Sequence, residues 1–138
     1  MTQPINEGNQ LQLLSVVIPA QNEDGCVCST VENLQRELRL ASIPHEIIVV
    51  DDGSTDRTWE LLQDLAGQMP ELKPVQNPGL KGFGRAIVCG LDRMKGDATV
   101  IMMADESDDC RDVIRYWREL NKGFDCVFGS RFIRGGGK

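Results

Sequence analysis

The sequence is poor in aromatic residues and in histidine, and it has no long apolar run. Aromatic side chains make up 5% of its 138 residues, and His45 is the only histidine. His45 precedes an expected strand and lies far from the strand carboxyl ends, so we reject it as a catalytic base and find no serine–histidine–acid triad. The apolar runs fall well short of the ~20 residues that span a bilayer. We therefore expect this chain alone to be soluble.

Positive charge is also scarce in this sequence. Lysine and arginine number 15 against 21 acidic residues, for a net charge of -6, and the pI is about 4.7. Nonspecific binding to nucleic acid needs a basic face, so we expect no nucleic-acid partner. The start, MTQPINEGNQ, lacks the basic leader and the apolar core of a signal peptide. We expect a location in the cytoplasm or at the cytoplasmic face of the membrane.

Cysteine is present in an odd number, and its spacing does not form the paired pattern of a zinc site. Cys26 and Cys28 are too close in sequence for a relaxed disulfide if they share a helix start. We expect buried free thiols in a reducing compartment. The cysteines are Cys26, Cys28, Cys89, Cys110 and Cys126.

Apolar strands and amphipathic helices alternate along the chain with short connections. This pattern predicts an α/β fold with a mostly parallel sheet and helices on both faces. We expect residues 1–11 to form a flexible lead-in and residues 12–138 to form one domain. The chain stops inside an apparent loop, FIRGGGK, so we expect this domain to be truncated at its carboxyl end. The expected strands are 13–18 (stopped by Pro19), 46–50, 73–76, 98–103 and 125–129. The expected helices are 26–40, 56–69, 85–94 and 110–122.

Two acidic clusters directly follow apolar strands. The first lies in VVDDGSTD, Val49 to Asp56, and the second is ADESDD, Ala104 to Asp109. Ligands in open α/β sheets bind at the carboxyl ends of the strands, so we expect Asp52 to point into a crevice there. Asp51 is expected to cap the next helix or to be solvated. Two such clusters favour a site for a cation and, through it, a phosphorylated ligand.

The second cluster offers the best metal ligand. Asp105 follows the strand directly, and hard cations such as Mg²⁺ and Mn²⁺ prefer oxygen ligands, often one or two carboxylates plus substrate phosphates. Asp108 and Asp109 are expected to begin the following helix, where negative charge suits the helix dipole. An ordinary solvated acidic face is the alternative for the cluster as a whole.

A glycine-rich loop, NPGLKGFGRA from Asn77 to Ala86, permits close backbone approach to a phosphate at a helix amino terminus. It matches neither GxGxxG nor GxxxxGK[ST], so neither a dinucleotide fold nor a P-loop is supported. Two interpretations of Lys81 stay open, a phosphate contact or a solvated charge. The same two stay open for Arg131 and Arg134. Glu23 either contacts a nucleotide or begins a helix.

Taken in order, VVIPAQNE, VVDDGSTDRTWELL, GLKGFGRA, MMADESDD and FGSRF resemble family 2 glycosyltransferases with the GT-A fold. The resemblance covers about residues 13 to 137 and is strongest to the dolichol-phosphate mannose synthase-like branch, which uses polyprenyl phosphates. It implies metal binding by Asp105 and Ser107, and catalytic roles for Asp105 and Arg131. It assigns contacts with a nucleotide sugar to Pro19, Gln21, Glu23, Val50, Asp52, Lys81, Met103 and Ala104.

The resemblance implies an inverting glycosyltransferase, with Mg²⁺ or Mn²⁺ as cofactor. The donor would be a nucleotide-diphosphate sugar, the acceptor a polyprenyl phosphate or a glycan, with peripheral membrane contact for a lipid acceptor. Met103 stands where the family's Asp-x-Asp metal motif has its first aspartate, which weakens the expected metal site, and Gln21 stands where the family often has an aromatic residue. Two alternatives stay open: a catalytically silent sugar-nucleotide-binding module, and a sugar nucleotidyltransferase.

Overall fold

The computed structural model describes residues 11–105 and 109–121. Within these residues one sheet of parallel strands forms, in the order β3-β2-β1-β4. This confirms the predicted parallel sheet. The predicted strand over 125–129 lies outside the described residues. The observed strands are β1 (Leu14–Ala20), β2 (His45–Asp51), β3 (Leu72–Gln76) and β4 (Ala98–Ile101).

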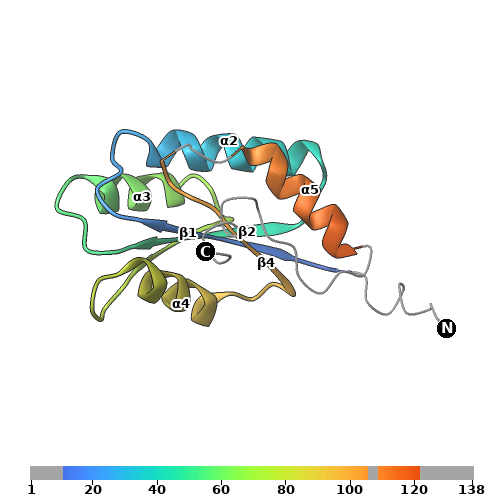
Figure 1. The fold of residues 1–138 in the computed structure, drawn as a ribbon. Helices are drawn as coiled ribbons and strands as arrows, with labels where there is room; N and C mark the ends of the chain where they lie inside the picture. The colour runs from blue at the N-terminus through green and yellow to red at the C-terminus, as the bar shows by residue number, and fades with distance from the viewer. Residues whose placement is uncertain (1–10, 106–108, 122–138) are drawn as a thin grey trace.

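Helices cover both faces of the sheet, as predicted (Figure 1). The helices α2 (Val27–Leu40), α3 (Thr58–Ala66) and α5 (Cys110–Asn121) lie on one face, and α4 (Phe83–Arg93) lies on the other. No helix in the described part of the chain is long and apolar enough to cross a bilayer.

The larger core lies between the sheet and the three-helix layer. The apolar positions of α2 that recur at helical spacing are fully buried there, as predicted: Val27, Val31, Leu34 and Leu38. Burying side chains of this size stabilises the fold by about 1.5–3 kcal/mol each. A smaller core lies under α4 and contains Ile48, Val50, Val75 and Ala86. The central strands are therefore buried on both faces, which explains why they read as continuous apolar runs.

The first strand does not stop at Pro19, contrary to the prediction. It runs to Ala20, and Pro19 pairs in register with Val50 of β2. The Val17 carbonyl accepts from Met102 N–H on the β4 side, so the backbone of Pro19, two residues on, faces that side as well. Paired residues of β4 end at Ile101, opposite Val17. The missing N–H of proline therefore removes no ladder bond.

The strand order places a topological switch point at one edge of the sheet. From β1 the chain moves outward to β2 and β3, and it then returns past β1 to form β4. The direction of winding reverses between β1 and β4, and ligands of open α/β sheets bind outside the strand carboxyl ends at such a switch point. Both acidic clusters of the sequence follow strands at this edge.

Four cysteines fall in the described residues, and all of them are free thiols. The predicted free state is confirmed for these positions, but each is only partly buried, so the prediction of buried thiols is wrong there. Burial nevertheless raises the pKa of the Cys28 and Cys110 thiols, which keeps both protonated and poorly reactive. Cys126 lies outside the described residues.

Candidate functional site

Polar contacts join the loops that follow β1 and β2. The Asn22 N–H donates to Ser54 Oγ at 2.9 Å, and Asn22 Oδ1 accepts from Thr55 N–H at 2.8 Å and from Asp56 N–H at 3.3 Å. Asn22 has a φ of 55°, a left-handed conformation that asparagine tolerates better than most residues. The sequence reasoning did not identify this role, although Asn22 stands inside the quoted QNE segment.

Asp56 and Thr58 link the loops after β1 and β2 to the start of α3. Asp56 Oδ1 accepts from the Thr58 hydroxyl at 2.6 Å and from Thr58 N–H at 2.9 Å. Thr58 Oγ1 in turn accepts from Glu23 N–H at 2.9 Å. Desolvation opposes the shift, but the hydrogen bonds from Thr58 and Asp24 lower the pKa of Asp56. The two loops therefore form one surface that presents Glu23 at the carboxyl edge.

Asp51 and Asp52 are both buried at the end of β2, with 3% and 5% of their surface exposed. Asp51 Oδ1 accepts from Ser54 N–H at 3.2 Å. It neither caps α3, which begins at Thr58, nor lies in solvent, so the prediction for Asp51 is wrong. The Asp51 carboxylate instead accepts a hydrogen bond within the turn that precedes the helix.

Each oxygen of Asp52 accepts a hydrogen bond from the glycine-rich loop. Asp52 Oδ1 accepts from Asn77 Nδ2 at 2.9 Å, and Oδ2 accepts from Gly82 N–H at 2.9 Å. A carboxylate has about four acceptor positions, so the remaining ones are left for a ligand. The buried carboxylate therefore links β2 to the amino terminus of α4.

Lys81 lies directly over the turn that follows Asp52. Gly53 has a φ of 76°, and a Cβ placed on it would come within 2.3 Å of Lys81 Cε. Only glycine gives both this backbone conformation and this close approach without strain. The structure therefore brings the Lys81 side chain, from the glycine-rich loop, beside the Asp52–Gly53 turn.

The segment after β4 returns to the same edge of the sheet. Ala104 is buried, and its carbonyl accepts from the Thr30 hydroxyl of α2 at 3.0 Å. Asp105, the next residue, is exposed. Desolvation and then the negative charge of Asp105 raise the pKa of Glu23. Asp105 therefore lies close enough to Glu23 for their charges to interact, which relates Asp105 to the loop after β1.

The other residues singled out in the sequence lie near this edge, at the opposite end of the sheet, or outside the described residues. Pro19 and Val50 are buried register partners near the ends of β1 and β2, and Gln21 is exposed just beyond β1. Met103 is partly buried between β4 and Asp105. Ser107 and Arg131 (with Arg134) lie outside the described residues. His45 begins β2, at the opposite end of the strand, where it contacts Gln35 and the Ile43 carbonyl.

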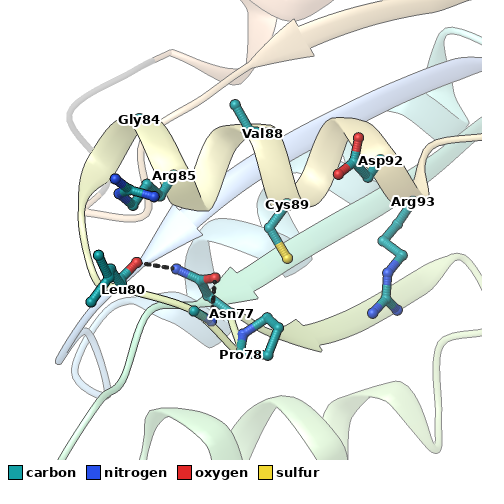
Figure 2. Close-up of a pocket in the computed structure, with 10 residues that line it drawn as sticks. Asn77, Pro78, Leu80, Gly84, Arg85, Val88, Cys89, Asp92 and Arg93 are labelled. Atoms are coloured by element: carbon teal, nitrogen blue, oxygen red, sulfur yellow. Dashed lines mark hydrogen bonds between the residues drawn. The ribbon is translucent and has the colours of Figure 1, made fainter.

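A cavity of about 610 Å³ opens between the glycine-rich loop and α4 (Figure 2). Its lining does not include Asp52, Lys81 or Asp105. The cavity therefore neighbours the carboxyl edge but is distinct from it. The side chains lining it are Asn77, Pro78, Leu80, Arg85, Val88, Cys89, Asp92 and Arg93.

Curated relatives match most of this chain. A dolichol-phosphate mannosyltransferase from Pyrococcus furiosus is 34% identical over 128 residues, which is 89% of this chain and 34% of that protein. An undecaprenyl-phosphate 4-deoxy-4-formamido-L-arabinose transferase from Yersinia enterocolitica is 30% identical over 125 residues, 89% of this chain and 38% of that protein. This chain thus spans a little more than a third of the length of these relatives.

Solved structures share the fold. Glucosyl-3-phosphoglycerate synthase from Mycobacterium tuberculosis superposes with a TM-score of 0.67 and 26% identity, over 87% of this chain and 45% of that one. A mannosyltransferase from Pyrobaculum calidifontis, solved with GDP-Man and Mn²⁺, superposes with a TM-score of 0.66 and 22% identity, over 91% and 38%. These similarities confirm the predicted GT-A fold.

The model of the glycosyl transferase family 2 matches residues 15–138, which is nearly the whole chain. The match includes both acidic clusters and the glycine-rich loop. The predicted resemblance is confirmed: this chain belongs to glycosyl transferase family 2.

Proposed function

We propose that this chain binds a nucleotide-diphosphate sugar at the carboxyl edge of β1, β2 and β4 and serves in the transfer of the sugar, with inversion, to a polyprenyl phosphate. The observation that carries the proposal is the gathering of Asp52, Lys81, Glu23 and Asp105 at this edge from segments far apart in the sequence. The names of the two curated relatives, which cite a dolichol-phosphate and an undecaprenyl-phosphate, support this class of acceptor.

The nucleotide would lie across the ends of β1 and β2. Pro19 and Val50, both buried near the strand ends, would support the nucleotide from below, and the Asp52 carboxylate would offer acceptor positions to the N–H or O–H groups of a base or ribose. The diphosphate would then reach Lys81, whose ammonium group is a mobile point charge suited to phosphate. Gln21, exposed beyond β1, would border the same ligand.

The oxygen-rich edge fits a hard divalent cation. No group of three or more His, Cys, Asp or Glu side chains that could hold a metal occurs in the described residues. Mg²⁺ is commonly held by one or two carboxylates together with substrate phosphates, so such a cluster is not needed. Asp105 would hold the ion together with Ser107, and Met103 removes the carboxylate that the family pattern places there. When bound, the cation supplies positive charge to the departing diphosphate.

Transfer then needs charge stabilisation more than proton transfer. The acceptor oxygen attacks the anomeric carbon on the side opposite the diphosphate, the bond from that carbon to the phosphate oxygen breaks, and the configuration inverts. Negative charge grows on the diphosphate, and Lys81 and Arg131 would stabilise it. A polyprenyl phosphate is already anionic, so its oxygen needs no protein base. That fits a site whose described side chains include no histidine.

The test is a thermal-shift panel of UDP-, GDP- and dTDP-sugars with and without Mn²⁺, followed by calorimetry on the best ligand. We expect one nucleotide to stabilise the chain, and Mn²⁺ to strengthen its binding. Asp105→Ala should abolish the effect of Mn²⁺ and reduce sugar transfer by a hundredfold or more, on the order of what one electrostatic contact to a developing charge is worth. Asp109→Ala, a nearby exposed carboxylate at the start of α5, is the matched control.

An Asp105→Ala chain that keeps its response to Mn²⁺ would defeat the assignment of this residue. A second candidate function, a sugar-nucleotide-binding module without catalysis, is favoured by Met103 in place of an aspartate. Tight nucleotide binding in the panel without any sugar transfer would support the silent module over the transferase.

A further inference from the structure

Asn77 occupies a central place in the glycine-rich loop. It follows β3, and its N–H donates to the Asp51 carbonyl at 3.0 Å, so its backbone is held against β2. Its side chain closes the turn that follows: Nδ2 donates to the Leu80 carbonyl at 3.0 Å and Oδ1 accepts from Gly79 N–H at 3.2 Å (Figure 2). The same Nδ2 also donates to Asp52 Oδ1 at 2.9 Å.

The Asp52 carboxylate completes this connection at the other end of the loop. Its second oxygen accepts from Gly82 N–H, at the amino terminus of α4. Gly82 has a φ of 151°, which favours glycine, so the loop enters the helix in a conformation that other residues adopt with strain. Asn77 and Gly82 thus hold the carboxylate from both sides, and Lys81 stands between these two anchors with its side chain over Gly53.

Burial makes this arrangement sensitive to the loss of a donor. Asp52 is 5% exposed, so water has little access to its oxygens. A buried carboxylate that loses a hydrogen-bond donor must rotate toward another donor or take the loop with it. Either movement would change the direction of the free acceptor positions of Asp52 and the place of Lys81.

We propose that Asn77 is a positioning residue of the donor site, which orients the Asp52 carboxylate toward the nucleotide and sets Lys81 beside the diphosphate. The inference rests on the proposed function, because Asp52 and Lys81 are the groups that would meet the ligand. The carboxamide suits this position because it donates to Asp52 and to the Leu80 carbonyl and accepts from Gly79 at once. An aspartate there has the same shape but no N–H to donate.

The experiment compares Asn77→Ala and Asn77→Asp with the wild-type chain, and uses UDP and GDP-Man with Mn²⁺ as calorimetric probes. Asn77→Ala should weaken the binding of the better nucleotide about ten- to a hundredfold, the range for loss of a hydrogen bond to a charged group. Asn77→Asp should bind poorly at pH 8 and regain part of its affinity at pH 5.5, because two carboxyls at hydrogen-bond distance raise one another's pKa and come to share a proton, which lets the new carboxyl donate to Asp52.

The pH comparison needs a matched control, because other charges face this position. They are Asp52 from β2, Lys81 from the loop, and Arg85, Asp92 and Arg93 from α4. Asn33→Asp makes the same chemical change on α2, where Asn33 accepts from Arg36, away from this loop. We expect its affinity to follow that of the wild type at every pH.

Amide hydrogen exchange without nucleotide separates this inference from the proposed function. Asn77→Ala should accelerate exchange at Gly82 N–H and leave the amides of β1 unchanged. Unchanged exchange at Gly82 overturns the positioning role, as does an Asn77→Asp chain whose affinity is unaltered or does not recover at low pH. A wild-type chain that binds neither nucleotide overturns the proposed function, and the exchange at Gly82 then still decides whether Asn77 holds the loop.

Discussion

At the scale of single residues, the candidate site depends on a few close approaches. Asp52 is buried and each of its oxygens accepts one hydrogen bond, and Lys81 passes over Gly53 closely enough that a single added carbon would meet it. Buried carboxylates persist in proteins only with such partners. The geometry of this edge therefore depends on contacts between residues from different loops. Single substitutions at these contacts should change the nucleotide affinity and the free energy of unfolding independently of each other.

Replacing Gly53 tests the close approach of Lys81. Gly53→Ala forces an alanine to adopt a φ of 76° and places its Cβ against Lys81. We expect a loss of about 1–2 kcal/mol in the free energy of unfolding from the left-handed conformation, and a weaker nucleotide affinity because Lys81 must move. Denaturant unfolding and calorimetry measure the two effects.

Gly25→Ala is the control for that change. Gly25 lies in the loop after β1, and a Cβ there would meet nothing within 4 Å. Its stability and nucleotide affinity should stay close to those of the wild type. If Gly53→Ala and Gly25→Ala bind nucleotide equally well, Lys81 does not contribute to binding from its observed position.

At the scale of elements, α4 packs unusually closely on the sheet. A Cβ on Gly90 would lie 2.5 Å from Val17 Cγ1 and 3.1 Å from Val50 Cγ2. The backbone of α4 therefore approaches β1 and β2 directly, which brings the loop before it, with Asn77 and Gly82, into reach of Asp52. The close packing of one helix thus decides where the glycine-rich loop can sit.

Two glycines on this helix should respond in opposite directions to the same substitution. Gly90→Ala should destabilise the fold by about 1–3 kcal/mol, since the added methyl group overpacks the interface with β1 and β2. Gly84→Ala, near the start of the helix and facing open space, should stabilise it by about 0.5 kcal/mol or more. Urea unfolding of both variants measures the difference, and equal stabilities would contradict the packing described.

At the scale of the whole molecule, a buried polar cluster holds the connection between α4 and β4 against the central strands of the sheet. Glu46 of β2 is 4% exposed, and its Oε2 accepts from the Ser15 hydroxyl and from Lys95 N–H, each at 2.6 Å. Gly96 N–H donates to Ser15 Oγ at 2.9 Å. The connection from α4 to β4 is thereby held against β1 and β2, which fixes the strand that leads to Asp105.

This cluster predicts how stability depends on pH. Desolvation opposes the shift, but hydrogen bonds from Lys95 N–H and the Ser15 hydroxyl and the charge of Lys73 lower the pKa of Glu46 from its ordinary 4.5. The folded state therefore holds this proton less tightly than the unfolded state does. The stability that Glu46 contributes is present above pH 4.5 and is lost as the pH falls through its lower folded pKa.

Glu46→Gln checks that prediction. The variant should lose about 1–3 kcal/mol at pH 7, because a charged acceptor is replaced among donors that remain buried. The loss should shrink as the pH is lowered below 4.5. Denaturant unfolding between pH 3 and 7 gives both values, with Glu60→Gln at an exposed position of α3 as the control. A loss that does not change with pH would argue against an ionised Glu46.

The sequence alone was enough to predict the alternation of strands and helices, the parallel sheet with helices on both faces, and the family. These features follow from local signals: apolar runs of strand length, apolar positions at helical spacing, and short motifs in a given order. The place of Asp52 and Asp105 beyond the ends of strands was also predictable, because parallel strands bring their carboxyl ends to one edge.

Only the tertiary structure decided what these side chains do there. It showed that Asp52 is held by Asn77 and Gly82, that Asn22 joins the loops after β1 and β2, and that the strand continues through Pro19. The donors are common polar side chains and backbone N–H groups far away in the sequence, and no spacing rule connects them. Their pairing follows from which loops the packed sheet brings together, which is a property of the folded chain.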